Sequence, residues 1–209
     1  EEKPTMGILI NGSEDSDSWY KDTADMQVIL KDNVGLKSYI LKVNGSVVQE
    51  TGIQGKEFPI SLSLSSLVNE DGIASVSIEV KDAVGNKSSW EKDIKVDTKA
   101  PSLSDVSVEG DYSIIGDIAY IKENLKVLGN ASDSESGVAK VELLKGDEVV
   151  SEGLPATIQD SGSYRIRVTD NVGHVTEKSL GDVMESINDI IFDNKSPVIS
   201  VESGADPDY

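Results

Sequence analysis

The sequence repeats a two-part pattern at a spacing that matches one small β domain. Asp-x-Val-Gly occurs at residues 82–85 and again at 170–173, and each copy is followed by Asp-x-Lys-x-Pro, at 97–101 and 193–197. The two prolines that close the second motif are 96 residues apart, and Pro4 stands 97 residues before the first of them. A fixed period of this kind indicates an array of like domains.

Short alternating apolar runs separated by turn residues predict strands within each period. In the first period such runs occur at 26–30, 58–64 and 74–80, and Asn44-Gly45 is typical of a tight hairpin turn. We count about seven runs per period, the number of an immunoglobulin-like sandwich. Aromatic residues make up only 5% of the chain, so each core must consist mainly of Val, Ile and Leu. The predicted fold class is all-β, with two tandem seven-stranded Ig-like β-sandwiches and little helix.

The repeat also predicts the domain boundaries. We expect one Ig-like sandwich over residues 1–98 and a second over 99–194. Residues 195–209 are then either the opening strand of a third repeat or a disordered tail. Between His174 and Asp193 the second repeat is longer than the corresponding part of the first by about eight residues, and we expect the insertion at 181–187, as a bulge or one helical turn.

Several turn residues are expected to have structural roles. Asp160, Gly162 and Tyr164 form the D-x-G-x-Y pattern of a tyrosine corner, in which the phenol bonds back to the backbone. The first repeat has Ala74 where the tyrosine would be, so we expect the loop before Ala74 to be less firmly held. The remaining positions are the aspartates of the repeated turns, which are expected to accept backbone hydrogen bonds, the glycines of those turns and the prolines of the joints: Asp32, Asp82, Asp170, Gly85, Gly173, Pro101 and Pro197.

Charge and composition exclude several classes of function. The net charge is -19, and so acidic a surface disfavours nucleic acid and anionic membrane surfaces as partners. The chain has no cysteine, which excludes disulfides and zinc–thiolate sites. His174 is the one histidine, which rules out a pair of histidine metal ligands, and the sequence shows no Ser-His-Asp order around it. We therefore expect no enzyme and no resident cofactor, and we expect His174 to be an exposed loop residue.

Calcium is the alternative that the acidic loops leave open. Glu14, Asp15 and Asp17 crowd one loop, and Asp133 and Glu135 another. Calcium takes hard oxygen ligands from such loops, but neither loop has the spacing of an EF-hand. The other interpretation is that these are solvated loops of an acidic protein.

The two tryptophans are expected to pack rather than bind a ligand. Trp19 borders a polar loop, where an aromatic ring could stack on a sugar, but its place before a strand favours packing against the sandwich. Trp90 lies on the alternating face of the last strand of the first repeat and is expected in the core.

These patterns resemble the bacterial Ig-like, fibronectin-III-like repeats of Gram-positive cell-surface proteins and of the tails of large secreted polysaccharide-active enzymes. The resemblance covers nearly the whole chain, with His174 at a position where the family usually has Asn. The matching segments are Trp19-Tyr20, 31–36, 80–86 and 96–101 in the first repeat, and 134–138 and 170–174 in the second. Motifs of turns and joints specify a fold better than a function.

The resemblance implies a non-catalytic extracellular repeat that acts as a semi-rigid stalk or spacer on the cell wall or cell surface. Its partners would be neighbouring Ig-like repeats of the same chain. The alternatives are an adhesin module that binds glycan or a host surface protein, and an accessory module of a secreted polysaccharide-active enzyme. Apolar stretches are far shorter than the ~20 residues of a membrane span, so we expect no direct membrane binding and any signal or anchor outside this sequence.

Overall fold

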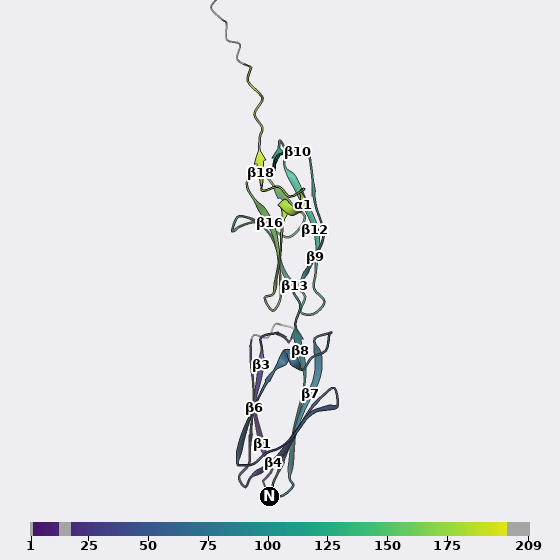
Figure 1. The fold of residues 1–209 in the computed structure, drawn as a ribbon, viewed down its shortest axis with the longest axis vertical. Coiled ribbons are helices and arrows are strands. Elements are labelled where there is room, and N and C mark those ends of the chain that lie inside the picture. Colours follow the sequence, from purple (N-terminus) through teal and green to yellow (C-terminus); the bar gives the residue numbers. More distant parts are fainter. Residues whose placement is uncertain (1, 13–17, 200–209) are drawn as a thin grey trace, which may run out of the picture. The chain divides into compact units, whose positions relative to one another are not determined.

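The structure, a computed structural model, describes residues 2–12 and 18–199, and nearly all of its regular elements are strands (Figure 1). The predicted all-β fold class is confirmed. The number of tandem domains and their boundaries at residues 98 and 194 stay predictions.

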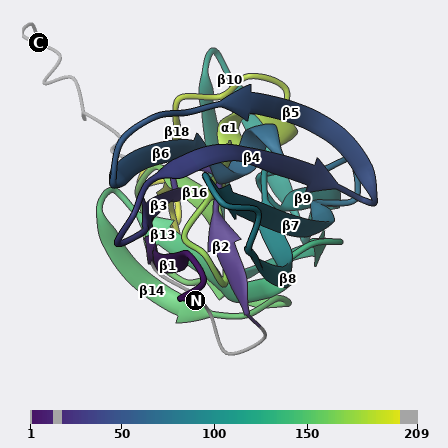
Figure 2. The same cartoon turned by 90° about the horizontal axis from the view of Figure 1, so that it is seen from below.

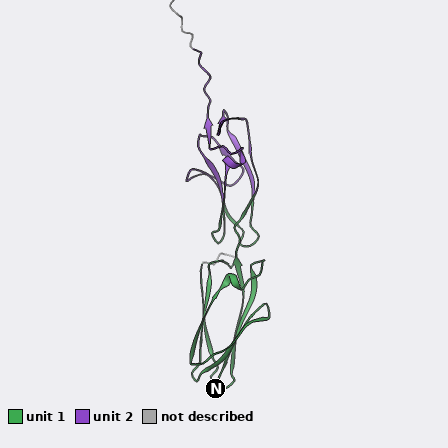
Figure 3. Cartoon of the chain, viewed as in Figure 1, with its two compact units in different colours: residues 1–103, 131–141, 168–176 green, residues 104–130, 142–167, 177–209 purple. Residues whose placement is uncertain are grey.

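Two compact units divide the chain at positions other than the predicted boundaries (Figure 3). Unit 1 contains Glu1–Leu103 together with two segments from further along the chain, Ala131–Val141 and Val168–Thr176. Unit 2 contains the rest, Ser104–Asn130, Glu142–Arg167 and Glu177–Tyr209. The joint at 97–101 therefore belongs to unit 1, as do the turns at 133–137 and 170–174.

Unit 1 contains a sandwich of a three-stranded sheet, in the order β1-β3-β6, and a five-stranded sheet, in the order β2-β8-β7-β4-β5. Its elements are β1 (Thr5–Asn11), β2 (Trp19–Lys21), β3 (Asp25–Lys31), β4 (Leu36–Val43), β5 (Ser46–Gly52), β6 (Glu57–Ser63), the 3-10 turn η1 (Leu64–Ser66), β7 (Ile73–Asp82) and β8 (Lys87–Asp97). Figure 2 shows β4 beside β5 from a second direction.

The core of this sandwich follows from strict alternation along the strands. Every second residue of β3 from Met26 to Leu30 is fully buried, and so is every second residue of β7 from Val76 to Val80. Because β4 pairs with β7 in antiparallel register, with Tyr39 opposite Val80, the inward faces of the two strands coincide. The alternation that predicts strands from sequence therefore also identifies the buried side chains.

A short strand not predicted from the sequence, β2, runs parallel to β8. Trp19 lies opposite Lys95 and Tyr20 opposite Val96. With only three residues it carries too little alternation to be seen as a strand. Both of its aromatic residues are buried, as expected for packing rather than ligand contact.

The remaining strands form three sheets, in the orders β15-β12-β9, β14-β13-β16-β17 and β10-β11-β18. They are β9 (Ser102–Glu109), β10 (Tyr112–Ile115), β11 (Ile118–Ile121), β12 (Leu125–Ser132), β13 (Val138–Lys145), β14 (Glu148–Glu152), β15 (Ala156–Ile158), β16 (Tyr164–Asp170), β17 (Val175–Ser179) and β18 (Asp189–Phe192). The β10–β11 hairpin is not predicted, because strands of four residues around a Gly-Asp turn give a weak signal. β11 pairs in parallel with β18, as β2 does with β8.

The insertion at 181–187 contains one helical turn, α1 (Leu180–Val183), which is one of the two forms that the sequence allows. Ser179 caps it by accepting a hydrogen bond from the Gly181 amide. Met184 and Ile187 of the insertion are buried, as is Leu180 directly before it, so this segment holds apolar side chains away from solvent.

Residues 193–199 are in neither a helix nor a strand, and residues 200–209 lie outside the described part of the chain. Pro197 is exposed in this segment. No helix among the described residues is long and apolar enough to cross a membrane.

Candidate functional site

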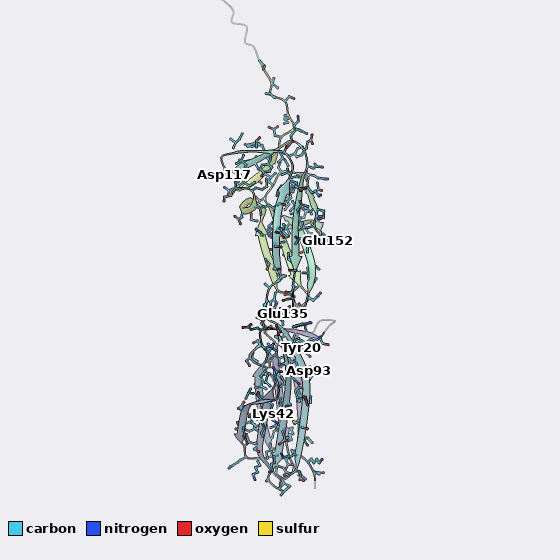
Figure 4. All side chains as sticks on the ribbon, turned by 90° about the vertical axis from the view of Figure 1, so that its right-hand side faces the viewer. Tyr20, Lys42, Asp93, Asp117, Glu135 and Glu152 are labelled. Carbon is cyan, nitrogen blue, oxygen red and sulfur yellow. The ribbon has the colours of Figure 1, made fainter. Side chains whose placement is uncertain are left out.

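The candidate site is a cluster of carboxylates around the single histidine, and all of its residues belong to unit 1. It is built from a repeated turn, from the joint at 97–101 and from the turn at 133–137. Glu135, labelled in Figure 4, marks its position on the chain.

The repeated turns position their aspartates in the same way. In the first repeat, Asp82 Oδ1 accepts hydrogen bonds from three successive backbone amides, and Asp82 Oδ2 accepts one from Asn86 Nδ2 at 2.7 Å. In the second repeat, Asp170 Oδ1 accepts from the Val172 and His174 amides at 3.0 and 2.8 Å. His174 Nδ1 lies 2.9 Å from Asp170 Oδ2, so the histidine occupies the place of Asn86.

The turn glycines allow this arrangement. Gly85 and Gly173 have φ angles of 106° and 90°, in the left-handed region that other residues rarely adopt. The third turn of this kind starts at Asp32, whose Oδ1 accepts from the Val34 and Gly35 amides. Its Oδ2 is buried and accepts no hydrogen bond from the described residues, since the fifth position is Leu36.

His174 is not the exposed loop residue that the sequence suggested, because its side chain is only 14% exposed. Its Nδ1 faces two carboxylates, Asp170 Oδ2 at 2.9 Å and Asp97 Oδ1 at 3.6 Å, and both of these side chains are fully buried. Its Nε2 lies 3.3 Å from Oδ1 of the more exposed Asp22. Because imidazole has two nitrogens, it can face carboxylates on both sides, which an asparagine in the same turn cannot do.

The pKa values of the turn groups reflect these contacts. Burial lowers the pKa of His174, but the hydrogen bond to Asp22 and the charges of Asp170 and Asp97 outweigh it, so the pKa is raised above its usual 6.5. Burial raises the pKa of Asp82, but the hydrogen bonds from the Asn86 side chain and the turn amides outweigh it, so that pKa is lowered. Each turn therefore favours the charged form of its titratable group.

Asp97 connects the joint to this cluster. Asp97 Oδ1 accepts from the Lys99 amide at 3.0 Å, and Oδ2 accepts from the Ser136 amide at 3.1 Å. Both bonds fix the orientation of a carboxylate that is completely shielded from solvent. The Lys21 ammonium donates to the Gly173 carbonyl at 2.9 Å rather than to Asp97.

The calcium candidates fall into two groups. Glu14, Asp15 and Asp17 lie outside the described residues. Asp133 caps its own turn, with Oδ1 accepting from the Glu135 and Gly137 amides. This is the role of Asp82 and Asp170 in their turns.

Glu135 extends from that turn to the joint. Its Oε2 accepts from the Thr98 amide at 2.6 Å, and its Oε1 lies 2.7 Å from the Lys99 ammonium, as a charge pair rather than an aligned hydrogen bond. The close contact with the Glu135 carboxylate raises the pKa of Lys99 more than burial lowers it, so the net shift is upward. Asp133 and Glu135 thus have protein partners, and calcium in this loop stays a prediction without further support.

The tyrosine corner residues lie together in unit 2. The Tyr164 hydroxyl donates to the Asp160 carbonyl at 2.9 Å, and Gly162 forms an isolated bridge with Ile190. The loop before Ala74 in the first repeat, which lacks the tyrosine, is held by a different side chain: Asn69 Oδ1 accepts hydrogen bonds from the Asp71 and Ile73 amides. The asparagine three residues before Gly72 is the sequence signal for it.

The structure also places the two tryptophans and the proline of the joint. Trp19 is buried, with the Lys95 ammonium 5.8 Å from its ring centre. Trp90 is half-buried and packs against the core of unit 1. The carbonyl of Pro101 accepts from the Thr176 hydroxyl at 2.6 Å, which fixes the end of the joint.

Chemically, the cluster can hold a proton or a cation. Asp97, Asp170 and His174 are the one group of three or more potential metal ligands that the described residues bring together, with their ligand atoms all within 4.8 Å of one another. From the sequence, Asp170 is expected only as a turn residue and Asp97 has no expected role.

Comparisons with known proteins add the following. No family model matches the chain, and no curated protein matches it. Among solved structures, the fibronectin(III)-like modules of Clostridium thermocellum CbhA are 13% identical, with a TM-score of 0.42, over 89% of this chain and 94% of theirs. Murine CEACAM1b is 11% identical, with a TM-score of 0.43, over 90% of this chain and 99% of its own.

A third structure comes from a 1.5-MDa bacterial ice-binding adhesin and concerns the retention of that adhesin on the surface of its host cell. It is 13% identical, with a TM-score of 0.38, over 86% of this chain and 65% of that one. These structural neighbours are thus fibronectin-III-like and Ig-like modules and a bacterial adhesin.

Proposed function

We propose that this chain is a non-catalytic extracellular module that acts as a semi-rigid stalk or spacer of a bacterial surface protein. The observation that carries the proposal is that hydrogen bonds hold the joint at 97–101 to other segments of unit 1. The predicted domains at 1–98 and 99–194 would be neighbouring repeats that partner each other through this segment.

Three hydrogen bonds tie the joint at successive points. The Asp97 side chain accepts from the Ser136 amide, the Thr98 amide donates to Glu135, and the Pro101 carbonyl accepts from Thr176. Pro101 also restricts its own φ and the conformation of the residue before it. A flexible linker would leave such backbone groups to solvent, so this pattern favours a joint with little freedom.

The surface charge is compatible with this role. A net charge of -19 makes neighbouring molecules repel each other, which keeps a dense layer of surface proteins apart. The Gram-positive cell wall as its location, with signal and anchor elsewhere in the parent protein, is part of the same proposal.

The test is the mobility of the joint in solution. We expect backbone ¹⁵N order parameters at Thr98 and Lys99 near the ~0.85 of rigid strands, whereas a flexible linker gives values below ~0.6. A variant with Gly-Ser-Gly-Ser inserted between Lys99 and Ala100 serves as the mobile control. Order parameters in the native chain equal to those of the insertion variant would refute the semi-rigid joint.

An adhesin that binds glycan or a host protein is the second candidate, and one observation favours it. A hollow of about 380 Å³ lies on the five-stranded sheet of unit 1, lined by Ile40, Lys42, Ser77, Ile78, Glu79, Ser89, Trp90 and Glu91. Hydroxyl and carboxylate groups of this kind can bind sugar hydroxyls. Specific retention on a glycan array, lost in Glu79→Ala, would favour the adhesin or an enzyme accessory module over a plain spacer.

A further inference from the structure

We propose that Asp97, Asp170 and His174 form a binding site for one divalent transition-metal cation of the Zn²⁺ class. The inference goes beyond the spacer function and does not depend on it. It rests on the geometry of the three ligand atoms, on their outer hydrogen bonds and on the balance of buried charge.

The ligand atoms already have nearly the spacing that a metal requires. His174 Nδ1 is 2.9 Å from Asp170 Oδ2 and 3.6 Å from Asp97 Oδ1, and all three atoms lie within 4.8 Å of one another. A tetrahedral ion with bonds of ~2.0–2.1 Å needs its ligand atoms about 3.3 Å apart. His174 Nδ1 therefore already stands close to the required distance from both carboxylate oxygens.

Each ligand is held from its outer side, which is how protein metal sites orient their donors. The His174 Nε2 faces Asp22 Oδ1 at 3.3 Å, so this nitrogen can keep its proton when an ion takes the place of the proton on Nδ1. Asp97 Oδ2 accepts from the Ser136 amide, and Asp170 Oδ1 accepts from two amides of its turn. The inner atoms are His174 Nδ1, Asp170 Oδ2 and Asp97 Oδ1, and the last of these also accepts from the Lys99 amide at 3.0 Å, which leaves it a second lone pair.

Among the described residues, the buried carboxylates of Asp97 and Asp170 form their ion pairs with His174. Asp97 and Asp170 are both fully shielded from solvent. Two ammonium groups beside the cluster have other partners, since Lys21 donates to the Gly173 carbonyl and Lys99 pairs with Glu135. Two buried carboxylates require compensation by a proton on His174 or by a cation.

An independent observation at the same place is the hydroxyl of Ser136. The residue is only 4% exposed, and its Oγ has no hydrogen-bond partner among the described residues. The amide of the same residue donates to Asp97 Oδ2 at 3.1 Å, so Ser136 adjoins the cluster. Buried hydroxyls normally have a partner, and a water in the fourth position of a metal would provide one.

The donor set selects the class of metal. Imidazole with carboxylates suits Zn²⁺ and its neighbours in the first transition row, whereas Ca²⁺ and Mg²⁺ take oxygen ligands only. Calcium is therefore not the ion predicted for this site.

The test is isothermal titration of the full, untagged chain with ZnCl₂ in phosphate-free buffer, before and after His174→Asn. This variant should fold, because Asn86 completes the same turn in the first repeat. We expect one Zn²⁺ per chain, with affinity reduced at least about 100-fold in the variant, since loss of an outer-shell partner alone costs about 10–100-fold. Asp93→Asn, which removes an exposed carboxylate of β8, should bind as the native chain does.

A second readout identifies the ligand atom. Because the chain has one histidine, its two imidazole nitrogens give two ¹⁵N resonances, and Zn²⁺ should shift that of Nδ1. The proposal is overturned if Zn²⁺ does not bind, if His174→Asn binds it as tightly as the native chain, or if the Nδ1 resonance does not move. Binding of Ca²⁺ in preference to Zn²⁺, unaffected by His174→Asn, would also overturn it.

Discussion

Replacing Glu135 with alanine should release the joint at a single, measurable amide. The Glu135 side chain is only 2% exposed, and its Oε2 accepts from the Thr98 amide at 2.6 Å. A hydrogen bond to a charged group contributes about 1.5–3 kcal/mol. The ion pair with Lys99 adds nothing to this figure, because solvent screens an ammonium that is half exposed.

Hydrogen exchange of the Thr98 amide measures this loss directly. Since 1.4 kcal/mol corresponds to a factor of ten, exchange should be roughly 10- to 100-fold faster in Glu135→Ala. The amide of Ile78, in the core strand β7, reports global unfolding and should change much less. Glu142→Ala is the matched control, because Glu142 is also buried and ion-paired, with Arg167, but does not contact Thr98.

Two results would refute the reasoning. Unchanged protection of Thr98 in Glu135→Ala would mean that the hydrogen bond does not hold the joint. An equal loss of protection at Thr98 and Ile78 would mean that the substitution destabilises the whole of unit 1 rather than the joint.

Three further predictions concern the individual domains. Tyr164→Phe removes the bond to the Asp160 carbonyl and should cost about 1 kcal/mol in urea unfolding; an unchanged midpoint would contradict it. Asn86→Ala should raise the pKa of Asp82 in a carboxyl NMR titration. Because a lowered carboxyl pKa gives stability that is lost as pH falls from the unfolded to the folded pKa, the variant should have less stability to lose on acidification, and its loss should be complete at a higher pH than in the native chain. Ile94→Ala, at a fully buried position, should cost about 2–5 kcal/mol by urea unfolding, and a loss below 1 kcal/mol would refute its place in the core.

The parts of the fold that sequence predicts well are those set by neighbouring residues. The turn at 82–86 is specified within five residues, because Asp82 and the amides that it accepts from are adjacent in the chain. The strand at 74–80 is visible because burial of one face imposes strict alternation. β2 and the β10–β11 hairpin are too short to give such a pattern, and only their partner strands define them.

The candidate site could be predicted only in pieces. His174 and Asp22 are 152 positions apart, so their contact depends on the packing of unit 1 and not on any local pattern. The available signal was the substitution of histidine for asparagine at the fifth position of a repeated turn. A histidine that merely replaces a turn asparagine is expected to be exposed. In the structure the His174 side chain is almost enclosed, because the buried Asp97 faces it.

The short parallel pair of β2 and β8 has a mechanical consequence. If the chain is the proposed stalk, a pulling force enters the first sandwich through β1 and leaves it through the end of β8. Since β2 follows β1 and runs parallel to β8, such tension draws the two strands in opposite directions along their axes. Their hydrogen bonds are then loaded in shear and must break together rather than in sequence. The parallel pair of β11 and β18 gives the second repeat the same geometry, so we expect the resistance of each repeat to stretching to depend on a few residues at one edge of a sheet.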